Sequence, residues 1–223
     1  GKTVFITGAS NGIGAATAKI MAASGADVII GYNTGLERAK KLLNELPANG
    51  HSIQQITLES SSSVKQAADN IKSNYDKLDV LVNSAGFTKP IPHQDLDALD
   101  DDFMDKMLIA NVRGPFSVIR ELCPLLKAAG ESTIVNLSSV SGFKGTGSSI
   151  AYVSCKAAID TMSLALARVL GPEIRVNCVS PGAVATDFVK GRDRNRLEKL
   201  AEKSPLRKIV EPEDVAKAIM TYV

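Results

Sequence analysis

Three side chains in the middle of the chain have the types and the spacing of a proton-transfer site. Tyr152 and Lys156 are four residues apart in a stretch with helical periodicity, which places them on one face of a helix. Ser139 follows a β-branched run, thirteen residues before Tyr152. Such a serine would lie at the carboxyl end of a strand, where ligands bind in open α/β sheets. The pattern therefore predicts a phenol, an ammonium and a hydroxyl close together.

These three groups suit the reduction of a carbonyl. A phenol can protonate the carbonyl oxygen while a hydride reaches the carbon, but its reference pKa is about 10. Lowering that pKa to neutrality takes about 4 kcal/mol, and an ammonium about 4 Å away supplies about 4 kcal/mol at an effective dielectric constant near 20. Lys156 is therefore an effect of the right size for Tyr152. The Ser139 hydroxyl can stabilise charge on the substrate oxygen.

A glycine-rich turn near the N-terminus predicts a binding site for a dinucleotide. Gly8, Gly12 and Gly14 lie between a predicted strand and a predicted helix. Glycines there let the backbone approach a pyrophosphate, and the helix N-terminus supplies free N–H donors. The strand–turn–helix context makes a plain connecting turn the weaker alternative.

The end of the second predicted strand bears on which dinucleotide binds. A carboxylate there would accept hydrogen bonds from the adenosine ribose and repel a 2′-phosphate. Tyr32, Asn33 and Thr34 occupy that place instead, and Arg38 follows one turn later. These donors favour NADP. NAD stays the alternative, because Asn11 stands in the turn where a basic residue would strengthen the preference.

Short β-branched segments alternate with longer helical patterns along the whole chain. The alternation predicts one α/β domain over residues 1–223, a Rossmann-type, doubly wound parallel sheet with helices on both faces and strand order 3-2-1-4-5-6. The predicted strands are 3–7, 27–31, 52–58, 79–83, 132–137 and 174–179. The predicted helices are 13–24, 36–46, 64–75, 103–126 with a bend near 114–115, 151–170 and 212–222, with a loop at 87–100 and a looser region at 181–205.

The composition argues against several other classes of protein. A hydrophobic fraction of 44% over 223 residues is too high for a disordered chain. A net charge of +2 gives no footprint for nucleic acid, and the basic stretch 190–203 is interpreted as a solvated helix face. We expect no membrane span and no secretory signal. Three cysteines without a CxxC pattern and two histidines favour free thiols, a cytoplasmic location and no metal site.

The order of these motifs resembles that of short-chain dehydrogenases/reductases over essentially the whole chain. The family's glycine turn matches 7–14, its NNAG element matches 83–86, and its YxxxK pair matches Tyr152 and Lys156. Its further motif positions match Asn111, Ser139, 177–182, Val184 and Thr186. The resemblance implies metal-free, direct hydride transfer between a nicotinamide and a ketone or secondary alcohol.

The resemblance implies a role for each matched residue. Tyr152 would be the general acid in reduction and the base in oxidation. Lys156 would also bind the nicotinamide ribose, and Asn111 would hold a proton-relay water through its backbone carbonyl. The predicted catalytic set is Asn111, Ser139, Tyr152 and Lys156. The predicted cofactor contacts are Gly8, Ser10, Asn11, Gly12, Ile13, Gly14, Tyr32, Asn33, Thr34, Leu58, Asn83, Ala85, Gly86, Tyr152, Lys156, Pro181, Gly182, Val184 and Thr186.

The sequence departs from the family pattern at three places. Ser84 replaces the second asparagine of NNAG. Thr57 stands where an aspartate often contacts adenine, which leaves a backbone contact at Leu58. Val223 comes before the seventh strand that usually closes the family's sheet. The family also implies a homotetramer or homodimer, built partly on the predicted helices 103–126 and 151–170.

The substrate is expected over Ser139 and Tyr152, under the segments 87–96, 142–150 and 187–205. These segments offer an apolar pocket for a ketone or alcohol of modest size, with the side chains of Phe87, Ile91, Phe143, Ile150, Phe188 and Val189. Relatives of the 3-oxoacyl-carrier-protein reductase type are the named alternative, and an acidic carrier would dock on basic residues such as Arg192, Arg194 and Arg196. A non-catalytic dinucleotide-binding regulator is the alternative of another class, which the intact catalytic set disfavours.

Overall fold

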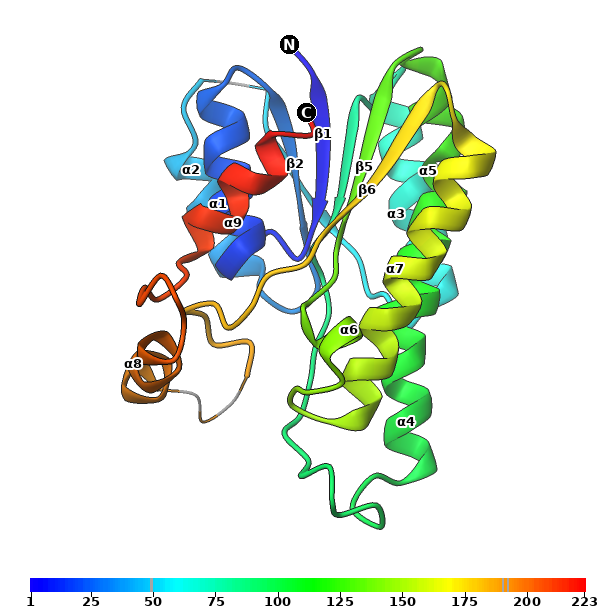
Figure 1. The fold of residues 1–223 in the computed structure, drawn as a ribbon. Helices are drawn as coiled ribbons and strands as arrows, with labels where there is room; N and C mark the ends of the chain where they lie inside the picture. Colours follow the sequence, from blue (N-terminus) through cyan, green and yellow to red (C-terminus); the bar gives the residue numbers. More distant parts are fainter. Residues whose placement is uncertain (49, 190, 192) are drawn as a thin grey trace.

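Six parallel strands form one sheet in the order β3-β2-β1-β4-β5-β6 (Figure 1). The structure is a computed structural model, and it describes residues 1–48, 50–189, 191 and 193–223. The strands are β1 (Thr3–Thr7), β2 (Asp27–Tyr32), β3 (Ser52–Gln55), β4 (Val80–Asn83), β5 (Ser132–Leu137) and β6 (Ile174–Val179). All pairings between neighbouring strands are parallel. The predicted doubly wound topology and strand order are therefore confirmed.

Helices cover both faces of the sheet (Figure 1). One face carries α1 (Gly12–Ala23), α2 (Leu36–Glu45) and α9 (Pro212–Met220), and the other carries α3 (Ser61–Asn74), α5 (Gly114–Ala128) and α7 (Ile150–Leu170). Because successive strand residues point to opposite faces, Val4 and Ile6 join the core cluster under α1 and α9, whereas Phe5 joins the cluster under α3 and α5. Both faces are buried, as is typical of a parallel sheet.

The third strand and the helix after it differ from the prediction. β3 ends at Gln55 rather than at residue 58, because the Thr57 amide turns away and donates to Ser63 Oγ at 3.0 Å. α3 begins at Ser61 rather than at residue 64. The Ser60 hydroxyl accepts from the Ser63 amide at 3.2 Å and so caps the helix one turn earlier.

The single long helix predicted over 103–126 consists of three segments. These are α4 (Asp101–Leu108), a π-helical turn η1 (Ile109–Arg113) and α5. The bend expected at 114–115 is replaced by this π turn, which inserts an extra residue just before it. The Asp100 carboxylate accepts from the Phe103 amide at 2.7 Å and fixes the start of α4.

The region expected to be looser contains α8 (Arg194–Glu202), which Asp193 caps, and this helix lies within the basic stretch 190–203 that was interpreted as a solvated helix face. A short helix α6 (Ser141–Lys144), which was not predicted, follows β5. Together with α4, these two helices extend past the carboxyl ends of the strands, and α8 lies across the opening from α4 and α6 (Figure 1). The carboxyl ends of the strands are therefore flanked by segments whose bounds the sequence pattern described poorly.

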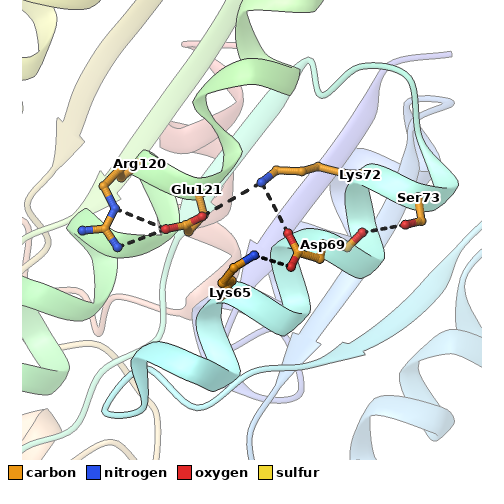
Figure 2. A network of polar contacts seen from close by, with 6 residues as sticks. All are labelled: Lys65, Asp69, Lys72, Ser73, Arg120 and Glu121. Atoms are coloured by element: carbon orange, nitrogen blue, oxygen red, sulfur yellow. Dashed lines mark hydrogen bonds and ion pairs between the residues drawn. The ribbon is translucent and has the colours of Figure 1, made fainter.

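The outer surfaces of α3 and α5 are joined by a chain of ion pairs (Figure 2). Asp69 contacts Lys65 at 2.6 Å and Lys72 at 3.7 Å, and Lys72 reaches Glu121 of α5 at 4.0 Å. Arg120 contacts the same Glu121 at 3.0 Å. Exposed pairs of this kind contribute little to stability, so the apolar cluster beneath them dominates the packing of the two helices.

Among the described helices, α7 alone is long and apolar enough to cross a membrane by length and composition. Only 28% of its apolar window is buried inside the chain. Helices of globular cores pass the same test. α7 packs against β6 and carries two of the predicted catalytic side chains, Tyr152 and Lys156.

Candidate active site

A cleft of about 1370 Å³ opens at the carboxyl ends of the strands. Ordinary small-molecule pockets measure roughly 300–1,000 Å³, so this cleft has room for a cofactor and a substrate together. Most of the predicted site residues line it. They are Gly8, Ser10, Asn11, Gly12, Ile13, Tyr32, Asn33, Thr34, Leu58, Ala85, Gly86, Ser139, Tyr152, Lys156, Pro181, Gly182, Val184 and Thr186.

The turn between β1 and α1 has the shape that its glycines predicted. Gly8 has φ +69°, and a Cβ there would lie 2.8 Å from Ala85 Cα. Gly14 does not line the cleft. A Cβ at Gly14 would lie 2.5 Å from Gly8 O, so this glycine lets α1 approach the turn rather than touching a ligand. The N-terminus of α1 faces the cleft, and Asn11 Oδ1 accepts from the Gly12 amide at 2.8 Å.

The end of β2 brings a guanidinium and a hydroxyl together. A Cβ at Gly35 would lie 2.7 Å from Arg38 Nη2 and 2.9 Å from Ser10 Oγ, so both groups lie on that glycine. Asn33 Oδ1 accepts from Thr57 Oγ1 at 2.9 Å. Thr57, which stands at the family's aspartate position, therefore orients Asn33 from the neighbouring strand end. The described part of this corner offers donors and no carboxylate at the tip of β2.

Lys156 is held between α7 and the end of β5. Its Nζ donates to Leu137 O, and Ser138 Oγ donates to Lys156 O at 3.1 Å. The residue is 7% exposed, and burial lowers the pKa of its ammonium to about 8. Cys155, Cys178 and Asp160 nearby oppose part of that lowering of the pKa. The sequence predicted Lys156 but gave no reason to single out Ser138.

Tyr152 and Ser139 lie on the same wall as Lys156. Ser149 caps α7 by accepting from the Tyr152 amide at 3.1 Å, which sets the first turn of the helix. Lys156 Nζ lies 5.6 Å from the centroid of the Tyr152 ring. Ser139 Oγ accepts from the Ser141 amide at 3.2 Å and donates to Pro181 O at 3.4 Å. The structure thus brings the phenol, the ammonium and the hydroxyl to one cleft.

Asn111 and Asn83 support the site without lining the cleft. Asn111 sits in the π turn, where its Oδ1 accepts from the Phe87 amide at 3.2 Å and its Nδ2 donates to Met107 O at 3.0 Å. Its side chain therefore fixes the segment that follows β4. Asn83 Nδ2 donates to Asn136 Oδ1 at 2.9 Å and ties β4 to β5. Both side chains hold the walls in place. The prediction gave Asn83 a contact with the cofactor and gave Asn111 a water bound through its backbone carbonyl, which stays a prediction.

The substrate end differs from the prediction in detail. Phe87, Ile91, Phe188 and Val189 line the cleft, but Phe143 and Ile150 do not, and Phe143 is 66% exposed. The Phe188 ring lies 5.9 Å from the Tyr152 ring. Of the basic residues proposed for carrier docking, Arg192 lies outside the described residues, as does Lys190 of the basic stretch.

Several lining residues were missed by the sequence analysis. They are polar or charged and come from separate elements and loops: Glu59, Lys106, Ser138, Lys144, Asp187 and Lys208. The described residues include no group of three or more His, Cys, Asp or Glu placed to hold a metal ion, and Cys123, Cys155 and Cys178 are free thiols.

Comparison with known proteins places this site in a family. A family model described as enoyl-(acyl carrier protein) reductase matches residues 8–222. The 3-oxoacyl-[acyl-carrier-protein] reductase of Aquifex aeolicus is 32% identical over 225 residues, which cover 99% of this chain and 89% of the relative. The chain belongs to the short-chain dehydrogenase/reductase family. It is therefore an oxidoreductase of the class that acts on CH–OH and ketone groups.

Two further relatives of this short-chain dehydrogenase/reductase bear on its chemistry. The acetoacetyl-CoA reductase of Cupriavidus necator is 30% identical over 218 residues, which cover 96% of this chain and 87% of the relative. A short-chain dehydrogenase from Burkholderia cenocepacia, solved in complex with NADP, is 32% identical with a TM-score of 0.87. That alignment covers 98% of this chain and 88% of the solved chain.

Proposed function

We propose that residues 1–223 form one dinucleotide-binding and catalytic domain that transfers a hydride between NADP(H) and a ketone or secondary alcohol. The observation that carries this proposal is that Ser139, Tyr152 and Lys156 share one cleft with the glycine turn of β1–α1. The cofactor, when bound, supplies the hydride. The protein supplies the proton and the stabilisation of charge on the substrate oxygen.

The catalytic side chains divide that work. The Tyr152 hydroxyl protonates the carbonyl oxygen in reduction and accepts the proton back in oxidation. The Lys156 ammonium stabilises the phenolate form of Tyr152. It is held in place by its hydrogen bond to Leu137 O, and the hydrogen bond from Ser138 Oγ to Lys156 O holds the backbone of the same residue. Ser139 Oγ binds the substrate oxygen, and its bond to the Ser141 amide orients it. Asn111 positions the segment after β4 and, through its backbone, the proton-relay water.

The cleft fits a phosphorylated dinucleotide. Gly8 lets the backbone turn close beside Ala85, and the turn and the N-terminus of α1 line the cleft, a position that suits a pyrophosphate. Ser10, Thr34 and Arg38 offer donors to a 2′-phosphate, and the described tip of β2 has no carboxylate to repel it. The NADP complex of the Burkholderia relative supports the same choice, with NAD as the second cofactor to be measured.

A second candidate is the reduction of 3-oxoacyl thioesters, including those on an acyl carrier protein. The names of the Aquifex and Cupriavidus relatives favour it. The test is loss of nicotinamide absorbance with NADPH or NADH over a panel of ketones, diketones and 3-oxoacyl thioesters. Turnover with NADPH above NADH supports the proposal. Cofactor binding without any turnover would instead support a non-catalytic dinucleotide-binding regulator.

We further propose that this enzyme is a homotetramer or homodimer. An apolar groove lies between α7 and the continuous segment α4–η1–α5, and most of the apolar window of α7 is unburied in one chain. The groove is lined by Leu108, Ile109, Val112, Arg113, Phe116 and Met162. A second copy would cover this face. Three free thiols fit a reducing, cytoplasmic location, and we propose neither a membrane nor a nucleic acid as partner.

A further inference from the structure

The π-helical turn η1 holds two separate segments that border the cleft. Asn111, within the turn, accepts from the Phe87 amide at 3.2 Å and so holds the segment after β4. Arg113, the last residue of the turn, reaches the segment after β3, where its Nη2 donates to Glu59 O at 2.5 Å. π turns inside helices are frequent at functional sites. The proposed function gives Asn111 a role and leaves Arg113 without one.

The segment that Arg113 reaches is the connection between β3 and α3, residues 56–60. Thr57 Oγ1 donates to Asn33 Oδ1 at 2.9 Å and so joins the first half of this connection to the end of β2. Leu58 and Glu59 come next and line the cleft. In dinucleotide-binding sheets the adenosine ribose lies at the end of the second strand, so the connection borders the adenine end of the cleft.

The start of α5 packs directly against the same connection. A Cβ at Gly114 would lie 2.7 Å from Leu58 Cβ and 3.0 Å from Leu58 O, so no side chain fits between this helix and Leu58. Arg113 binds the next carbonyl along the chain, that of Glu59. Two consecutive residues of the helix therefore fix two consecutive residues of the connection.

The adenine wall of this chain depends on its backbone. Thr57 stands where an aspartate of the family often contacts adenine, and its hydroxyl is already bonded to Asn33. The remaining contact is the one expected from the backbone at Leu58. A loop that is ordered before the ligand arrives costs less free energy to bind it, so whatever orders this backbone raises the affinity for the cofactor.

We propose that Arg113 is a positioning residue for the cofactor, because its bond to Glu59 O holds the connection 56–60 in the shape that receives the adenine. Asn111 and Arg113 thereby fix opposite ends of the cleft from one π turn. This inference rests on the proposed function. It adds a residue that does not itself line the cleft.

Arg113→Met tests the proposal by removing the bond while keeping a long side chain. The Kd for NADPH, measured by fluorescence titration, should rise about three- to tenfold, which is the effect of one hydrogen bond. At saturating NADPH, kcat should stay within about twofold of the wild type, because the loss affects binding alone. Arg113→Lys keeps a donor and should recover most of the affinity. A fall in kcat as large as the rise in Kd would show that Asn111 has moved as well, and would contradict the proposal.

Arg120→Met is the matched control for charge. Arg120 is exposed on the same helix α5, and its loss changes the net charge by the same amount. It contacts Glu121 at 3.0 Å rather than the connection, so its Kd for NADPH should equal that of the wild type. An equal rise in Kd in Arg120→Met and Arg113→Met would assign the effect to long-range attraction of the cofactor and overturn the proposal.

A second control concerns assembly, because Arg113 also lines the groove proposed as the subunit interface. Light scattering should give Arg113→Met the mass of the wild type at the concentrations used for the titrations. A smaller mass that accompanies the weaker binding would assign the effect to assembly and reject a direct role for the bond to Glu59.

Fragments of the cofactor locate the effect in the cleft. ADP-ribose and 2′-phospho-ADP-ribose keep the adenosine half, whereas reduced nicotinamide mononucleotide keeps the other half. Arg113→Met should weaken the tighter-binding of the two ADP-ribose compounds by the same factor as NADPH, and should leave the Kd for the mononucleotide unchanged. Equal weakening of both halves would reject a role at the adenine end.

Hydrogen exchange separates this inference from the proposed function. Exchange is followed by mass spectrometry in the protein without cofactor. Amides of residues 56–60 should exchange about three- to tenfold faster in Arg113→Met, while residues 109–112 keep the wild-type rate. If no nicotinamide cofactor binds the wild type, the proposed function fails, while the exchange still decides whether Arg113 orders the connection; unchanged exchange at 56–60 would overturn the inference.

Discussion

Lys156 combines a catalytic charge with a buried position. Burial lowers the pKa of its ammonium from 10.5 to about 8, so the group that stabilises the Tyr152 phenolate is itself close to losing its proton. The bond from Nζ to Leu137 O satisfies one of its three donors and directs the ammonium toward the end of β5. The ammonium is therefore well placed beside Tyr152, and its charge is progressively lost above about pH 8.

This position predicts a pH dependence. The value of kcat/KM, which reports the free enzyme, should fall as pH rises through about 8, because the ammonium is lost there. Lys156→Arg keeps its charge above pH 8, so any residual activity of that variant should lack the decline. A decline at the same pH in Lys156→Arg would assign it to another group.

The same shift affects stability. Between about pH 8 and 10.5 the unfolded chain binds more protons at Lys156 than the folded chain does, so the contribution of Lys156 to the free energy of unfolding increases with pH.

Tyr152 provides the second prediction at the scale of single residues. Tyr152→Phe removes the transferable proton and leaves the ring that contacts Phe188. Turnover should fall by about 100-fold or more, in line with the loss of a general acid, while the Kd for NADPH, measured by fluorescence titration, changes little. Retained turnover would reject Tyr152 as the acid. A parallel loss of NADPH binding would show that the substitution disturbs the cleft instead.

The residues that carry chemistry were predictable where their spacing has a geometric meaning. Tyr152 and Lys156 needed only the helical repeat, and the glycines needed only the strand–turn–helix order. The supporting contacts were not predictable in this way. Ser138 reaches Lys156 O across 18 positions of sequence, and Lys106, Lys144 and Arg196 line the same cleft from the separate helices α4, α6 and α8. Contacts of this kind depend on tertiary packing, and the local periodicity of a single sequence does not reveal which distant residues will meet.

At the scale of elements, the position of α7 depends on contacts with β5. Three consecutive residues, Asn136, Leu137 and Ser138, each make a hydrogen bond to α7. Asn136 also accepts from Asn83 Nδ2, so β4, β5 and α7 share one buried polar connection. Since buried polar groups cost free energy when unpaired, this connection favours one register of the helix on the sheet.

Asn136→Ala tests that connection. The substitution leaves the Asn83 amide without its buried partner and opens a small cavity, so the free energy of unfolding should fall by about 2–4 kcal/mol. Urea denaturation followed by circular dichroism measures this change. The control is Asn70→Ala on the exposed side of α3, which should shift it by less than about 0.5 kcal/mol. Equal shifts in the two variants would show that the buried bonds add nothing.

The elements themselves were predictable to different degrees. Strands buried on both faces and helices of three or more turns follow from apolar runs and periodicity, and these predictions were confirmed except for the division of the helix 103–126 and the bounds of β3 and α3. The π turn at Ile109–Arg113 was not predicted, because one inserted residue hardly changes the apolar pattern of the helix. α8 was anticipated only as a solvated helix face within 190–203, and its bounds were not predicted, because its hydropathy is low and only Leu197 and Ala201 are buried in it.

At the scale of the whole molecule, one surface has more exposed apolar area than a single chain requires. α7 has 28% of its apolar window buried, and Leu164 and Val169 on it are 68% and 74% exposed. Phe116 on α5 is 40% exposed at the groove between the two helices. Contiguous apolar surfaces of this kind are typical of subunit interfaces. Because the same helices carry the catalytic residues and the π turn, association would also restrain the site.

Phe116→Glu should therefore shift the protein to a smaller assembly. A carboxylate in the groove would be buried without a partner at the interface, which costs several kcal/mol per copy if it stays charged. Light scattering after size-exclusion chromatography measures the mass of the wild type and the variant at matched concentrations. Leu206→Glu is the control, because Leu206 is 84% exposed after α8 and does not line this groove, so its mass should equal that of the wild type. If the wild type has the mass of one chain at micromolar concentration, or if Phe116→Glu keeps the wild-type mass, then the groove between α5 and α7 is not the interface, and the unburied face of α7 needs another explanation.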